Sequence, residues 1–450
     1  MRGPARLLAL VVFAIASLAF PLTAWAEHEN DPRTENLVPR GHIVEPRVLG
    51  GAAFDPINQP DGDIHTDIAF RGNLAVQGNW DGFNIRDISS PDNPQQLSRT
   101  FCDGNQGDVI VYEDVVVRSW NTPAGTPGAF GAARTCDGRP VRRGFEGLHV
   151  FDISNLQDPT LVAQVPTPCG SHTATAVPDP DNGRLLVYNS PSSGQCPGFQ
   201  IVEVPLGAPE DSQMLGTAQS SGPCHDIGVI LGDALRAACA GGTSLRVYSL
   251  GGEQGGSLAQ PALMYEKRVP RVTIGHSAVF SWDGDVIVFG HEPGGGVAAE
   301  CEQTDPTWKK SYYFYETETG NRLGQWRLPR PQGATENCSL HNPNTVPLES
   351  GRDIVVFGAY QAGTWVVDFS DLENTVTVAW SDPPPKPVPP QSPFCCDVTG
   401  SWSSFWYDGQ IYESNIGEGL NIFTLNDPRV AGAITLGHLN PNTQEFSLPN

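Results

Sequence analysis

One strand-turn-strand pattern occurs seven times along this 450-residue chain, between about residue 64 and residue 438. Each copy opens with a short hydrophobic strand, makes a tight turn and returns as a second strand, as in HSAVFSWDGDVIVFG from His276. A repeat of this kind decides the fold before any single motif does, because periods of 20 to 50 residues are typical of solenoids and propellers. The seven copies begin at His65, Gly107, His172, His225, His276, His341 and Ser401.

A second pair of strands follows each copy, for example GLHVFDISNLQDPTLV from Gly147 and TWVVDFSDLENTVTVAW from Thr364. Apolar residues in these segments alternate or run together between clusters of Gly, Pro, Asn and Asp, which is typical of strands, and helical periodicity is missing. Four strands per unit, repeated seven times, predict an all-β fold. We expect residues 61–450 to form a seven-bladed β-propeller with four-stranded blades.

The second strand pairs carry a resemblance to a known family. The segments FNIRDISSPDNP from Phe83, GLHVFDISNLQDP from Gly147 and TWVVDFSD from Thr364 are similar to the LVIVD-repeat family, which is named for a hydrophobic strand that ends in Asp before Ile-Ser and a proline turn. The resemblance covers most of the chain after residue 26. It implies an exported or surface β-propeller and no single activity, so it leaves the function open.

The first 26 residues have the features of a secretory signal peptide. Two arginines precede the apolar run Leu7 to Phe20, and the small-residue site Ala24-Trp25-Ala26 follows. No second long apolar stretch occurs, so we expect a secreted or extracytoplasmic protein without membrane insertion. Residues 27–60 form a polar tail, and the part from Asn36 is a candidate for a strand that pairs with the last blade and closes the ring.

The charge balance excludes one class of partner. The chain has 50 acidic and 27 basic side chains, a formal net charge of −23. A protein that neutralises phosphates needs the opposite balance, so we expect no nucleic-acid partner.

Ten cysteines follow the predicted leader. An even count in an exported chain predicts disulfides rather than free thiols. Their order along the chain suggests nearest-neighbour pairing, with Cys224 bonded to Cys239 inside one hairpin. Cys395 and Cys396 are the doubtful pair, because a bridge between adjacent residues needs a strained turn.

Five of the seven units place a histidine at the same point, just before or at the start of the inner strand. Strand direction alternates within a blade, so these histidines are expected on one face of the disc, called here the top face, around the mouth of the central channel. Hairpin counting puts His291 opposite His276, with Glu292 next in line. The insertions after the second strands should lie on the same face: Asn121 to Gly144, Ser190 to Gly198 and Glu292 to Lys310.

Several imidazoles that converge from rigid strands are what an open metal site requires, because imidazole is the commonest ligand of Zn, Cu and Fe in proteins. The pattern therefore predicts a divalent transition metal as cofactor, with six candidate ligands: His65, His172, His225, His276, His291 and His341. Asp108, Asp226 and Asn342 are candidate further ligands, or acceptors that fix the imidazole tautomers. In the alternative interpretation the histidines are struts that bond the backbone or a hydroxyl of the next blade.

Two classes of function follow from these alternatives. In a metal-dependent lyase, hydrolase or oxidase, Glu292 is the candidate catalytic acid or base. In a non-catalytic scaffold, the top face binds a protein or a glycan instead of a small molecule. Trp80, Trp120, Trp402 and Tyr360 are expected near this face, where they either stack on a ligand or fill the interfaces between blades.

Overall fold

The structure is a computed structural model that describes residues 31–43, 64–104, 106–125, 135–385 and 400–449. The predicted signal peptide lies outside these residues, and so do Cys395 and Cys396.

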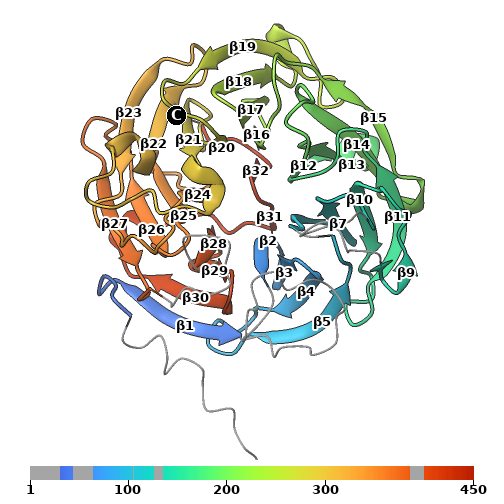
Figure 1. The fold of residues 1–450 in the computed structure, drawn as a ribbon, viewed down its shortest axis with the longest axis horizontal. Helices are drawn as coiled ribbons and strands as arrows, with labels where there is room; N and C mark the ends of the chain where they lie inside the picture. Colours follow the sequence, from blue (N-terminus) through green and yellow to red (C-terminus); the bar gives the residue numbers. More distant parts are fainter. Residues whose placement is uncertain (1–30, 44–63, 105, 126–134, 386–399, 450) are drawn as a thin grey trace, which may run out of the picture.

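Seven antiparallel sheets stand around one axis as the blades of a β-propeller (Figure 1), which confirms the predicted fold. The strands of each blade are given from the axis outward. Blade one consists of β2 (His65–Arg71), β3 (Leu74–Asn79), β4 (Gly82–Asp87) and β5 (Gln95–Phe101), and blade two consists of β6 (Val109–Tyr112), β7 (Val115–Trp120), β10 (Gly147–Asp152) and β11 (Thr160–Pro166). Blade three consists of β12 (Ala174–Asp179), β13 (Arg184–Asn189), β14 (Phe199–Pro205) and β15 (Gln213–Ala218). Blade four consists of β16 (Asp226–Ile230), β17 (Arg236–Gly241), β18 (Ser244–Ser249) and β19 (Ala262–Arg268). Blade five consists of β20 (Gly275–Phe280), β21 (Val286–His291), β22 (Ser311–Glu316) and β23 (Arg322–Arg327). Blade six consists of β24 (His341–Thr345), β25 (Ile354–Gly358), β26 (Thr364–Asp368) and β27 (Val376–Ser381).

Blade seven closes the ring with strands from two distant parts of the chain. Its inner strands are β28 (Ser401–Tyr407), β29 (Gln410–Asn415) and β30 (Gly419–Leu425), and its outer strand is β1 (Leu37–Ile43). β1 runs antiparallel to β30, from the pair Leu37 and Leu425 to the pair Ile43 and Leu420. This strand belongs to the tail segment for which the sequence suggested a closing role.

Burial decreases from the axis to the rim. Every residue of the inner strands β6 and β20 is buried, because each inner strand is covered on both faces by neighbouring blades. The outer strand β19 alternates exposed and half-buried residues, as expected where only one face is covered. The hydrophobic core is therefore a set of clusters between blades; Ile110, Leu148 and Leu185, for example, belong to one cluster shared by blades two and three.

The chain after blade seven crosses the channel, which the sequence did not predict. β31 (His438–Leu439) pairs with the end of β2, and β32 (Thr443–Gln444) pairs with the end of β16. Figure 1 shows this segment in red across the centre of the ring. These are the ends of the inner strands opposite to the histidines, so the segment closes the bottom of the channel.

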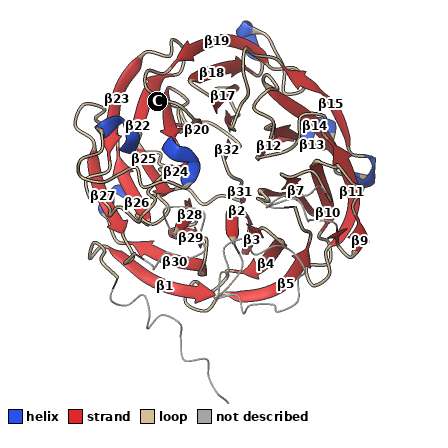
Figure 2. Cartoon of the chain, in the orientation of Figure 1, coloured by secondary structure: helices blue, strands red, loops and turns tan. Residues whose placement is uncertain are grey.

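The described part of the chain also has short 3-10 turns and one small hairpin: η2 (Pro180–Asn182), η3 (Pro209–Asp211), η4 (Gly252–Gln254), η5 (Pro293–Gly296), η6 (Thr307–Lys310), η7 (Pro428–Val430), β8 (Thr135–Cys136) and β9 (Arg139–Pro140). η5 and η6 lie in the insertion of blade five, and η5 stands beside the central opening (Figure 2). Among the described residues, no helix has the length and apolar character needed to cross a membrane.

Four disulfides connect neighbouring cysteines in the sequence, as predicted: Cys102–Cys136, Cys169–Cys196, Cys224–Cys239 and Cys301–Cys338. Three of their cysteines stand within a few residues of a pocket histidine, as Cys224 does beside His225. The bridges therefore tie the second-strand segments and insertions to the segments that carry the histidines. Four disulfides are compatible with an extracytoplasmic protein.

Candidate metal-binding pocket

The top end of the channel is a cavity of about 640 Å³, called here the axial pocket. This volume is in the usual range for sites that bind small molecules. Four of the six predicted histidines line the pocket, together with carboxylates and aromatic side chains: His172, His225, His276, His341, Asp67, Asp108, Glu146, Asp226, Glu292, Trp80, Tyr360 and Trp402.

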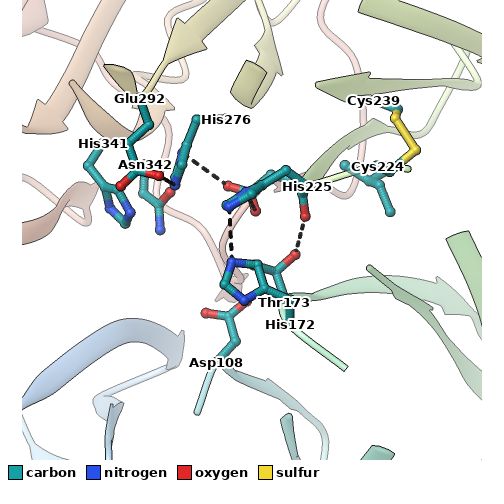
Figure 3. Close-up of polar contacts among 12 residues, drawn as sticks. Asp108, His172, Thr173, Cys224, His225, Cys239, His276, Glu292, His341 and Asn342 are labelled. Atoms are coloured by element: carbon teal, nitrogen blue, oxygen red, sulfur yellow. Dashed lines mark hydrogen bonds and ion pairs between the residues drawn. A yellow bond between two sulfur atoms is a disulfide. The ribbon is translucent and has the colours of Figure 1, made fainter. Parts of the chain in front are cut away.

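The four histidines form an arc across blades three to six (Figure 3). Ring centroids are 4.4 Å apart between His172 and His225, 4.3 Å between His225 and His276, and 4.2 Å between His276 and His341. Each ring comes from the same point of its blade, so the repeat itself produces the arc.

His172 and His225 meet through their Nε2 atoms, which are 3.0 Å apart. Nδ1 of His172 lies 3.0 Å from Oδ1 of Asn121, and Nδ1 of His225 lies 3.1 Å from Oδ1 of Asp226. Because both Nδ1 atoms face acceptors, the neutral rings are Nδ1–H tautomers whose Nε2 lone pairs point at each other. That arrangement is repulsive unless a proton or a metal ion lies between the nitrogens. Two ligands at adjacent corners of an octahedral ion lie about 2.9 Å apart, given N–metal bonds of about 2.0–2.1 Å.

The same pair differs in basicity. Burial and the neighbouring His225 lower the pKa of His172 to about 3. Burial also acts to lower the pKa of His225, but the hydrogen bond and charge of Asp226 outweigh it, so the pKa of His225 is raised. Without a metal, the proton of this pair would therefore stay on His225.

His276 stands in the middle of the arc between two carboxylates. Its Nδ1 has no hydrogen-bond partner and lies 3.6 Å from Oδ2 of Asp226, and its Nε2 lies 3.9 Å from Oε2 of Glu292. The side chain is 3% exposed. Burial, together with the neighbouring histidines, keeps its pKa well below the ordinary value, so the ring is neutral. A buried ring nitrogen without a partner is costly, and a metal ion would remove that cost.

Two groups of three potential ligands share His276. His225 and Asp226 complete one group, and Glu292 and His341 complete the other, with all ligand atoms of a group within 4.8 Å of one another. Two imidazoles and one carboxylate are a set that transition metals accept, and they leave coordination positions open.

His341 is already oriented from its far side. Its Nδ1 lies 2.5 Å from the carbonyl oxygen of Trp402, so Nδ1–H donates and the Nε2 lone pair remains available. Burial lowers the pKa of His341 to about 3. The bond to Trp402 is also the contact that the strut interpretation requires.

Threonine hydroxyls make some of the contacts between neighbouring inner strands. Thr66 donates to the carbonyl of Gly107 at 2.8 Å, and Thr173 donates to the carbonyl of His225 at 2.7 Å. These hydroxyls connect the blades at the level where the histidines were candidates for struts. The imidazoles of His172, His225 and His276 face one another instead.

The prediction that His291 touches His276 is wrong. Gly275, not His276, pairs with His291, because the register shifts between Gly275 and Ala278. A shift of one residue turns a strand side chain to the other face. The His291 ring accordingly stacks on Trp308 with centroids 5.7 Å apart, and His291 is not among the residues that line the pocket.

His65 also does not line the pocket, although it is buried at the start of β2. Burial and the charge of Arg86 lower its pKa well below the ordinary value. Of the six predicted ligands, the structure therefore brings four together and places His65 and His291 outside the arc.

Blades two and seven have Gly107 and Ser401 at the position of the histidines. In blade two the structure shows why a histidine is absent. A Cβ atom at Gly107 would lie 2.3 Å from the guanidinium of Arg118. That guanidinium fills the position and donates to the carbonyls of Asn79 and Gly82. Ser401, the counterpart in blade seven, is fully buried, and its hydroxyl contacts that of Ser404.

The side of the pocket next to blades one and two is acidic. Asp67 and Asp108 interact with each other across the two blades. Burial raises the pKa of both, and the charge of Asp67 raises that of Asp108 further. Asn342 donates to both oxygens of Asp67, at 2.8 and 2.6 Å.

Glu292 lies between His276 and the aromatic wall. The hydroxyl of Tyr360 donates to its Oε1 at 3.2 Å. Burial raises the pKa of Glu292 to about 7, although the charge of His225 acts in the opposite direction.

Two pocket residues have left-handed backbone, at φ 37° for Asn342 and φ 41° for Tyr360. This conformation is costly for a bulky residue such as tyrosine, and such strain is concentrated at functional sites. Tyr360 is held there by two backbone hydrogen bonds with Ser401 of the next blade.

Sequence reasoning missed part of the pocket. It named Asp108, Asp226 and Asn342 but not Asp67 or Glu146. Asp67 follows His65 by two residues, and that short spacing on an inner strand was the signal available. A further group, Cys102, Cys136 and His149, also has ligand spacing, but its two sulfurs form a disulfide and are not free to bind a metal.

Comparisons with known proteins add little to this geometry. No protein-family model matches the chain, and no curated protein matches its sequence. Among solved structures, the computationally designed Ika8 protein is similar with a TM-score of 0.41 and 12% identity, over 80% of this chain and 96% of that one. A likeness this weak carries no argument. The class of protein is therefore defined by its own structure, a seven-bladed β-propeller with a histidine-lined axial pocket.

Proposed function

We propose that the axial pocket binds a divalent transition-metal ion through His276, together with either His225 and Asp226 or Glu292 and His341, and that the protein is a metal-dependent enzyme acting on a small molecule. The observation that carries the proposal is the position of His276. It is a buried imidazole with an unpartnered nitrogen, and it is shared by two groups of three potential ligands.

Three further features support the metal. The lone pairs of His172 and His225 face each other at 3.0 Å. The far nitrogens of His225 and His341 contact acceptors, as they do where imidazole binds a metal. The candidate ligands stand in or directly beside strands of neighbouring blades, so the site is rigid.

Bound metal would act as a Lewis acid at the bottom of the pocket. Glu292 is the candidate acid or base, because its carboxylate faces the pocket beside His276 and its pKa of about 7 suits proton transfer at neutral pH. The hydroxyl of Tyr360 fixes its orientation.

The test is the metal content of protein purified without a histidine tag. We expect about one transition-metal ion per chain, and at least about tenfold less after His276→Ala, because a ligand is removed from a rigid site. His438→Ala is the control, since His438 is half-buried at the closed end of the channel. Metal near zero in the wild type, with a lower melting temperature for His276→Ala, would contradict the proposal and favour struts.

A second candidate function rests on the bond between His341 and the Trp402 carbonyl, which is a strut contact. In that case the protein is a non-catalytic scaffold, and the insertions around the pocket bind a protein or a glycan. The metal measurement separates the two candidates.

The proposal also covers the localisation, the family and the partners of the protein. We infer that the protein is exported, from the predicted leader and the four disulfides, and that it belongs with the LVIVD-repeat propellers that its second strand pairs resemble. Its partners are then small molecules at the top face. Nucleic acid is disfavoured by the net charge of −23.

A further inference from the structure

The charged side chains that line the axial pocket are mainly acidic. Five carboxylate residues line it, namely Asp67, Asp108, Glu146, Asp226 and Glu292, and no lysine or arginine does so among the residues that the structure describes. Arg118 lies behind Gly107 with its guanidinium on backbone carbonyls, so it is not a lining residue. An anionic ligand would be repelled by these carboxylates, whereas a cationic ligand would offset their charge.

Buried acceptors in the pocket lack donors. Oδ1 of Asn342 has no hydrogen-bond partner, although the residue is only 3% exposed and its amide nitrogen is bound to Asp67. Oδ2 of Asp226 has none either, and Asp226 is fully buried. A ligand that donates several hydrogen bonds from one atom would satisfy such acceptors. An ammonium group has three donors and no acceptor.

The remaining wall is aromatic. Tyr360 and Trp402 stand edge to face with centroids 5.8 Å apart, and Trp80 packs against the same cluster. All three line the pocket. Aromatic faces accept apolar groups and also attract cations.

We infer, building on the proposed function, that the ligand of this pocket is a small organic amine. Its ammonium group binds beside Asp67 and Asn342, and its apolar part packs on Tyr360 and Trp402. The cavity of about 640 Å³ limits the ligand to a small molecule rather than a polymer.

The test uses three probes that share one ring and differ in charge: benzylamine, benzyl alcohol and benzoate, titrated calorimetrically at pH 7.5. We expect benzylamine to bind at least about tenfold more tightly than benzyl alcohol, and benzoate not to bind, because carboxylates line the pocket and no lysine or arginine does so among the described residues. The titrations are made on metal-free and on metal-loaded protein. A preference for the amine in metal-free protein stands even if the metal measurement fails, so the two proposals can fail separately.

Two variants locate the effect. Asp67→Asn should reduce the preference for the amine over the alcohol to less than about threefold, because it removes the charge while keeping the shape. Asp152→Asn is the matched control, since Asp152 is only half-buried at the end of β10, which lies away from the pocket. If Asp67→Asn does not fold, Asp67→Ser, which removes the same charge, replaces it. Equal binding of amine and alcohol, tighter binding of benzoate, no binding of any probe, or an unchanged preference in the variant would each overturn the inference.

Discussion

At the scale of single residues, the sequence located most of the site but not its contacts. The repeat placed His172, His225, His276 and His341 on one face, and the structure brings their rings into an arc. It could not place His291, because the bulge after Gly275 changes the register by one residue and leaves no mark in the hairpin length. The pairing of Asp67 with Asp108 joins two blades, and no local pattern reveals such a contact.

Glu445, near the closed end of the channel, gives a prediction about pH. Burial and the charge of Glu113 raise its pKa to about 7 from the ordinary 4.5. The folded state therefore binds this proton more tightly than the unfolded state, so the destabilisation is full above about pH 7 and disappears below about pH 4.5. Glu445→Gln should raise the free energy of unfolding by about 2–3 kcal/mol at pH 8 and leave it unchanged at pH 4.

Urea denaturation at the two pH values measures this difference. Glu253→Gln is the control, because Glu253 is an exposed residue of η4. A gain for Glu445→Gln that is equal at both pH values would show that the effect is not the titration of this carboxyl.

At the scale of elements, blades are held together by close backbone approaches and by the C-terminal segment. Sequence patterns gave the strands of each blade, because apolar runs and turn residues are local signals. They did not predict that the residues after β30 return to the axis. Asn440 and Thr443 lie among polar residues and proline, which are equally common in surface loops. Their side chains bond to the backbones of two different blades, at Val111 and at Ala176.

Asn440 is the key contact of this segment. Its Oδ1 accepts from the amide of Val111 at 2.7 Å, and its Nδ2 donates to the carbonyl of Val111 at 2.8 Å, so its amide group continues the sheet of blade two. Asn440→Ala leaves two buried backbone groups without partners and should lower the free energy of unfolding by about 2–4 kcal/mol. Asn73→Ala, in the exposed turn between β2 and β3, is the control and should change it by less than about 0.5 kcal/mol in equilibrium denaturation. If both variants change the free energy of unfolding equally, Asn440 does not hold the C-terminal segment to blade two in the way described.

The approach of blades four and five depends on Gly228. A methyl group there would lie 1.9 Å from the carbonyl oxygen of Ala278, a backbone atom that cannot move alone. Gly228→Ala should therefore lower the free energy of unfolding by about 2 kcal/mol or more. Gly216→Ala in the outer strand β15 adds the same methyl group to open space. A thermal melt in which both variants match the wild type would contradict this account of the interface.

At the scale of the whole molecule, the fold followed from the sequence because the ring is a repeat. Seven units with a histidine, glycine or serine at one position specify seven blades and put those positions at one end of the channel. The pocket is a property of the whole ring. It exists because the C-terminal segment closes the other end, and its acidic and aromatic sides come from blades far apart in the chain.

The central claim is that a metal ion binds to the histidines of the axial pocket. Anomalous diffraction from crystals of untagged protein, measured at the absorption edges of the bound metals, tests it most directly. We predict one peak in the axial pocket, within about 2.0–2.2 Å of a ring nitrogen of His276 and of a ring nitrogen of either His225 or His341. A pocket without a peak in crystals soaked with zinc or copper, with the four imidazoles bonded only to protein groups and water, would contradict the metal site and leave the histidines as struts.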